Sequence, residues 1–103
     1  MMPEFSAPEL QWVFNWACDR VSANRNSIFY EGYQGIANRI HDEYCKLLSG
    51  YHTDFTCSEL SDIASIALDV KIKSKAGTPR FELARSVFQK ATDMRKALEK
   101  KSC

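Results

Sequence analysis

The chain of 103 residues contains 45% hydrophobic and 26% charged residues and has a formal net charge of +1, values that are ordinary for a soluble globular protein. This length predicts one helical domain, 1–103, whose core needs no metal or disulfide to fold, and four glycines and three prolines exclude a low-complexity chain. Because no apolar run approaches ~20 residues and the N-terminus lacks a secretory signal pattern, we expect a cytoplasmic protein with reduced cysteines and no membrane partner.

The first predicted helix begins in the segment FSAPEL, which contains a complete capping box. Ser6 is the expected N-cap, and Glu9 is placed to accept a hydrogen bond from the N-cap backbone. Phe5 and Leu10 stand before and after this box as a hydrophobic staple. The sequence therefore predicts a helix that starts directly after Ser6.

This first helix has two apolar faces. One stripe at helical spacing is the expected core face: Leu10, Val13, Phe14, Ala17 and Val21. Trp12 and Trp16 lie nearly opposite the centre of that stripe, so this second face must be covered by something other than the core or be left exposed.

The second predicted helix runs from an N-cap at Ser27 to about Leu48 and ends at Ser49 and Gly50. Its apolar face is expected to contain Tyr33, Ile36, Ala37, Ile40, Tyr44 and Leu47. Two glycines weaken its start, so residues 28–35 could instead form an aromatic-rich loop, and both forms stay open at this point.

The third predicted helix begins at a second capping box, in FTCSEL, with Thr56 as the N-cap and Glu59 three residues later. Phe55 and Leu60 form its hydrophobic staple. A wide apolar arc is typical of a deeply buried helix: Leu60, Ile63, Ala64, Ile66, Ala67, Leu68 and Val70. Its last residues, 69–73, alternate between polar and apolar and could be extended instead.

A fourth helix is expected from Thr78 and Pro79 to about Lys100, after a break at residues 75–77. Its apolar face is Ala84, Val87, Phe88, Ala91, Met94 and Leu98. The four elements predict an all-α fold, a compact four-helix arrangement of two antiparallel helical hairpins, about 6–49 and 56–101.

The two predicted hairpins resemble each other. The two capping boxes lie 50 residues apart, and the second members of the hairpins align at an offset of 51. An internal duplication is one interpretation of this parallel. The other is that helix starts look alike because capping boxes and staples are common devices.

Both histidines and two of the four cysteines fall within 17 residues, which suggests a zinc site as one hypothesis. The candidate ligands are His41, Cys45, His52 and Cys57. Structural zinc sites contain a tight pair of cysteines, which this sequence lacks, so we expect no metal and no cofactor. A cysteine–histidine nucleophile could be drawn from the same residues, but no activating motif surrounds them and we expect no enzyme.

Charge is unevenly distributed along the chain. Residues 1–70 hold ten acidic and four basic residues, whereas residues 71–103 hold three acidic and ten basic residues. The basic segment 71–101 makes a nucleic-acid-associated helical protein the alternative function. Its candidate residues share a side of the last helix: Arg85, Lys96 and Lys100. Acidic residues interrupt that side, so this function ranks second.

The aromatic residues favour a different function. Interfaces between proteins are enriched in tryptophan, tyrosine and phenylalanine. The candidates for a partner-binding surface are Trp12, Trp16, Phe29, Tyr30 and Tyr33. We therefore expect a non-catalytic protein–protein interaction module, an adaptor or inhibitor that binds a larger partner or itself, most simply as a homodimer. The alternative is that both tryptophans belong to the core.

Overall fold

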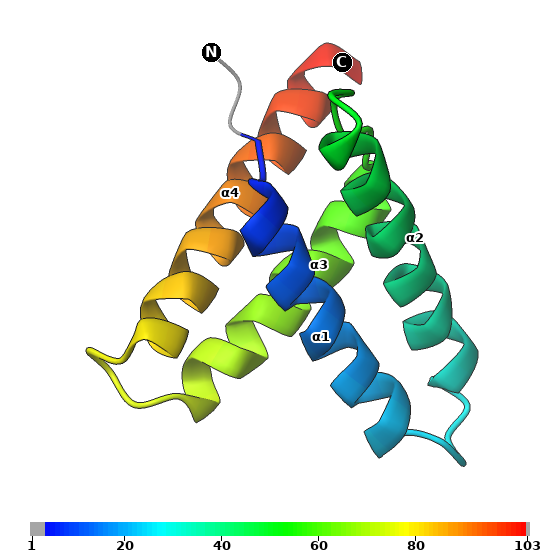
Figure 1. Ribbon diagram of the computed structural model, residues 1–103, viewed down its shortest axis with the longest axis vertical. Helices are drawn as coiled ribbons and strands as arrows, with labels where there is room; N and C mark the ends of the chain where they lie inside the picture. The colour runs from blue at the N-terminus through cyan, green and yellow to red at the C-terminus, as the bar shows by residue number, and fades with distance from the viewer. Residues whose placement is uncertain (1–3, 103) are drawn as a thin grey trace. The chain divides into compact units, whose positions relative to one another are not determined.

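The computed structural model describes residues 4–102, with the side chains of residues 4–100, and this part of the chain contains four helices and no strand (Figure 1). The helices are α1 (Ala7–Ala23), α2 (Tyr30–Leu48), α3 (Cys57–Lys73) and α4 (Pro79–Ser102). The predicted all-α fold is confirmed. None of these four helices combines the length and the apolar character that a membrane crossing requires.

The chain divides into two compact units, each built on one helical hairpin. The first hairpin, residues 6–53, contains α1 and α2; the second hairpin begins at Asp54, contains α3 and α4, and is joined in its unit by Phe5. Within each hairpin the two helices run in opposite directions from a connecting turn (Figure 1). Phe5 packs edge-on against Phe55, with ring centroids 6.0 Å apart, and both rings are buried.

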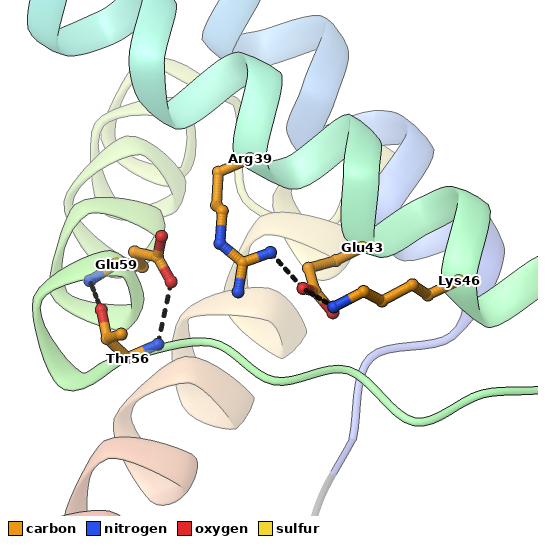
Figure 2. A network of polar contacts seen from close by, with 5 residues as sticks. All are labelled: Arg39, Glu43, Lys46, Thr56 and Glu59. Carbon is orange, nitrogen blue, oxygen red and sulfur yellow. Dashed lines mark hydrogen bonds and ion pairs between the residues drawn. The ribbon is translucent and has the colours of Figure 1, made fainter.

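Both predicted capping boxes are present. Ser6 Oγ accepts a hydrogen bond from the Glu9 N–H at 3.3 Å, and Glu9 Oε1 accepts one from the Ser6 N–H at 2.8 Å. Thr56 and Glu59 make the same two bonds at 3.2 and 2.9 Å (Figure 2). Because these bonds satisfy backbone groups that a helix start leaves unpaired, α1 and α3 begin where the sequence predicts.

The predicted stop of the second helix is also confirmed. The Tyr51 N–H donates to the Lys46 carbonyl at 2.9 Å, and the Gly50 N–H donates to the Leu47 carbonyl at 3.1 Å. These two bonds are the Schellman motif, in which the residue after the C-cap is left-handed. Gly50 has φ +88°, a conformation that glycine adopts without a steric penalty.

The predicted start of the second helix at Ser27 is wrong. Ser27 Oγ accepts a hydrogen bond from the Phe29 N–H at 3.1 Å, and α2 begins only at Tyr30. A serine side chain that bonds two residues ahead forms a local turn, which competes with N-capping. Because the helix then continues through Gly32 and Gly35, the alternative of a loop over residues 28–35 holds only for residues 28–29.

The structure also shows whether residues 69–73 are helical and where the fourth helix begins. Residues 69–73 are helical, and an ion pair of 3.1 Å joins Lys73 to Asp69 across one turn, so the extended alternative is wrong. Thr78 Oγ1 accepts a hydrogen bond from the Phe81 N–H at 3.3 Å, as expected of an N-cap.

The core faces predicted for the last three helices are confirmed at their central positions. The buried apolar side chains of these helices are Ile36, Ala37, Ile40, Leu60, Ile63, Ala64, Ile66, Ala67, Val70, Ala84, Val87, Ala91 and Met94. Leu68 is the exception in α3, because its side chain is 38% exposed.

A carboxylate also lies in the buried face of α2. The Glu43 side chain is 0% exposed, yet Arg39 and Lys46 on the same helix both pair with its Oε1 atom, Lys46 at 3.0 Å (Figure 2). Burying an unpaired carboxylate is costly, and the two cations reduce that cost from one helical turn on either side. Both cations keep part of their side chains in water.

α1 buries a different arc from the predicted one. Its buried residues are Glu9, Leu10, Val13, Trp16 and Ala17. Compared with the predicted stripe, this arc is rotated towards Trp16, which is 3% exposed, while Phe14 and Val21 lie half-buried at the edge. The prediction that both tryptophans lie outside the core is therefore wrong for Trp16. Trp12 is 50% exposed.

Replacing Thr56 by Ala should lower the free energy of unfolding by about 1 kcal/mol, because the Glu59 N–H loses its acceptor at the start of α3. Urea unfolding followed by circular dichroism measures this change. Thr92→Ala is the matched control, since the Thr92 hydroxyl bonds only backward to the Phe88 carbonyl within α4 and caps nothing. Equal losses in the two variants would contradict the capping role.

Asp62 predicts a pH dependence of stability. Desolvation, and secondarily the charge of Glu59, raise the pKa of the Asp62 carboxyl above its unfolded value of about 3.9. The folded state then binds the proton more readily than the unfolded state, so the carboxylate costs stability at neutral pH and that cost disappears as the pH falls through the folded pKa. We expect Asp62→Asn to stabilise the protein at about pH 7 and to be neutral at about pH 3.

Urea unfolding at the two pH values tests this expectation. Asp69→Asn is the control on the same helix, because Asp69 pairs with Lys73 and its removal should not stabilise the protein at neutral pH. An Asp62→Asn variant that is less stable than the parent protein at about pH 7 would show that the carboxylate stabilises the fold there, contrary to this expectation.

Candidate interaction surfaces

The turn between α1 and α2 carries two large apolar side chains in solvent. Ile28 is 91% exposed and Phe29 is 60% exposed. The turn is hydrogen-bonded: the Ser27 N–H donates to the Asn24 carbonyl at 2.9 Å, and the Tyr30 N–H donates to the Ser27 carbonyl at 3.1 Å. An ordered turn thus holds Ile28 and Phe29 outward, and we call this pair the apolar turn.

The other predicted partner-binding aromatics are placed differently. Tyr30 and Tyr33 are half-buried, and the Tyr33 ring lies 5.8 Å from the Arg20 guanidinium of α1, so Tyr33 serves the contact between α1 and α2. Trp16 is buried, which leaves Trp12 and Phe29 as the exposed members of the predicted set.

Sequence reasoning missed Ile28, the most exposed large apolar residue of the described chain, because it chose only aromatic residues as candidates for the interface. It also missed Leu48 and Tyr51, which are 62% and 68% exposed around the end of α2. The serine before Ile28 could have indicated a turn at this position, since serine favours a local turn as readily as a helix cap.

Two of the four candidate zinc ligands meet on α2. Cys45 Sγ lies 3.9 Å from His41 Nδ1, and the His41 ring packs against Phe14 of α1 with centroids 5.3 Å apart. His52 is exposed and Cys57 is half-buried. Across residues 4–102, no three His, Cys, Asp or Glu side chains are grouped so that they could hold a metal ion.

A hollow lies beside this pair in the first hairpin. It has a volume of about 240 Å³ and is lined by Gln11, Phe14, Asn15, His41 and Tyr44. Pockets that bind drug-sized molecules occupy about 300–1,000 Å³, so this hollow is small for a ligand site.

Several cations of α4 have local partners. Arg85 pairs with Glu82, and Arg95 pairs with Glu99 at 3.7 Å and donates to Ser61 Oγ of α3 at 3.2 Å. Lys96 and Lys100 are exposed. Of the three residues predicted to contact nucleic acid, Arg85 therefore has its charge offset within its own helix.

Comparison of the chain with protein-family models, with curated proteins and with solved structures found no match. The candidate surfaces are therefore distinguished by their own exposure and chemistry. The apolar turn stands out because it places an aliphatic and an aromatic side chain next to each other in solvent.

Cys18 and Cys45 should differ in chemical reactivity, because they differ in burial. Burial, and secondarily Asp19, raise the pKa of the half-buried Cys18 thiol, whereas Cys45 is exposed. Because the thiolate is the reactive form, maleimide should label Cys45 at least about tenfold faster than Cys18 near neutral pH. The ratio should narrow at higher pH, as Cys18 gains thiolate.

Mass spectrometry of a Cys103→Ser variant measures this order, since Cys103 lies outside the described residues. In denaturant the two rates should converge. Native Cys18 labelling as fast as Cys45 labelling would contradict the prediction.

Proposed function

We propose that the chain is a non-catalytic, cytosolic protein-interaction module that self-associates through the first hairpin. The observation that carries this proposal is the exposure of Ile28 and Phe29 at the apolar turn, with Trp12 half exposed on α1. Large aliphatic and aromatic side chains gain free energy when they leave water. Such residues are also those that dominate the energy of protein interfaces.

A second copy of the chain is the partner that this surface fits best. In a two-fold interface the same patch appears on both subunits, and an apolar turn is complementary to itself. Exposed charges of opposite sign flank the turn, Arg25 before it and Glu31 after it. In a two-fold contact centred on the turn, Arg25 of one copy would face Glu31 of the other, which fixes the orientation.

Sedimentation velocity over a range from about 10 µM to about 1 mM protein tests self-association. We expect the unmodified chain to shift from monomer to dimer, and Ile28→Ser together with Phe29→Ser to weaken the dimer by at least about tenfold. Leu48→Ser together with Tyr51→Ser is the matched control, because these large apolar side chains are also mostly exposed but lie at the other end of α2. Circular dichroism should show unchanged helicity in all variants.

A charge reversal tests the two-fold geometry itself. Arg25→Glu should weaken the dimer, because it places two acidic residues opposite each other. Adding Glu31→Arg should restore it. A chain that stays monomeric up to about 1 mM would overturn the proposal. A dimer that is unaffected by the Ile28→Ser and Phe29→Ser changes would show that the interface lies elsewhere on the chain.

A further inference from the structure

The turn between α3 and α4 lies at one end of the second hairpin (Figure 1), and the sequence around it is rich in basic residues. Residues 70–81, which we call the basic turn, contain four cations and no acidic residue: Lys71, Lys73, Lys75 and Arg80. Elsewhere on this hairpin the charges differ: residues 54–69 contain four acidic residues and no cation, and in the rest of α4 acidic and basic residues are interspersed, as in the Arg85–Glu82 and Arg95–Glu99 pairs. The basic turn is therefore a distinct anion-attracting surface.

The same end of the hairpin exposes apolar side chains. Within the described part of the second hairpin, the large exposed hydrophobic residues are Leu68 at 38% and Ile72 at 73%. They lie one helical turn apart on α3, so they are neighbours on its surface. Lys71 and Lys73 stand on either side of Ile72 along the chain.

The lysines near Ile72 have different surroundings. Lys73 pairs with Asp69 at 3.1 Å, and the Lys71 ammonium lies 5.8 Å from the centroid of the Phe81 ring. Lys75 and Arg80 are exposed in and after the turn. Ile72 thus has a lysine on each side of it along α3, and two further cations, both exposed, follow in and after the adjoining turn.

We propose that this end of the second hairpin binds the surface of an anionic lipid bilayer. Ile72 and Leu68 enter the headgroup region, while the cations of the basic turn meet the negative lipid headgroups. The expectation of no membrane partner rested on the lack of a long apolar run, which bears on crossing a bilayer and not on contact with its surface.

A nucleic acid fits this surface less well than a bilayer. Its phosphates would match the cations, but it offers no apolar region for an exposed isoleucine. Single strands are bound by stacking on exposed aromatic rings, and Phe81, the aromatic residue of the basic turn, is half-buried next to Lys71. The exposed Ile72 therefore favours lipid.

Vesicle co-sedimentation tests the proposal, with vesicles of phosphatidylcholine alone and of phosphatidylcholine mixed with phosphatidylserine. We expect weak, reversible binding to the mixed vesicles that falls as salt is added, and little binding to neutral vesicles. Ile72→Ser should lower the partition coefficient by about tenfold, because it keeps every charge but removes the apolar contact.

The cations are tested by a matched pair of variants. Lys75→Gln should lower the partition coefficient by about fivefold, whereas Lys96→Gln, which removes an exposed lysine from the C-terminal part of α4, should change it little. Circular dichroism of each variant should match the parent protein. Equal effects of the two changes would overturn the assignment to the basic turn.

A duplex DNA and a single-stranded RNA oligonucleotide serve as competing probes. Tight binding to either one that Ile72→Ser leaves unchanged, without binding to anionic vesicles, would overturn the lipid proposal in favour of a nucleic-acid partner. Absence of binding to anionic vesicles at low salt would also overturn it. This inference does not rest on the proposed self-association, whose variants lie in the other hairpin.

Discussion

The hydrogen-bonding needs of the backbone at helix starts control much of this structure. The first N–H groups of a helix have no partner within it, so a side chain that accepts from them fixes where the helix begins. Ser6 and Thr56 do this with reciprocal help from Glu9 and Glu59. Along the helix, the period of 3.6 residues then decides which side chains share a face. α2, whose start carries no side-chain cap in the described structure, begins three residues after the serine proposed for it.

The difference between helix ends that local hydrogen bonds fix and those that they do not fix also explains how far the sequence could predict the fold. Capping boxes, the glycine stop and the apolar stripes are local patterns, and they gave correct helices and core faces for most of the chain. Trp16 was misplaced because α1 is apolar on two sides, and its sequence alone does not say which side is covered. Glu43 was not expected in the core, since a single acid on an apolar face looks solvated until cations four residues before and three residues after it are considered together.

The candidate surfaces were harder to predict than the core, for a related reason. Whether Ile28 or Ile72 is exposed depends on a few residues around a helix end, where local hydrogen bonds compete with continuation of the helix. Aromatic content pointed to residues 29–33, but Tyr33 is used within the hairpin and the neighbouring Ile28 is more exposed. Except for Trp12, which is half exposed on α1, the large exposed apolar side chains of the described residues lie at or near the two hairpin turns and around the end of α2.

The contact between Phe5 and Phe55 has a topological consequence. It closes the intervening chain into a loop, because the residues that precede and follow the first hairpin meet with ring centroids 6.0 Å apart. The intervening chain is the first hairpin, in which α1 and α2 run in opposite directions and so turn the chain back (Figure 1). The first hairpin is therefore inserted into the second unit at a single point. Both rings of this contact belong to the unit that would remain if the whole first hairpin were removed.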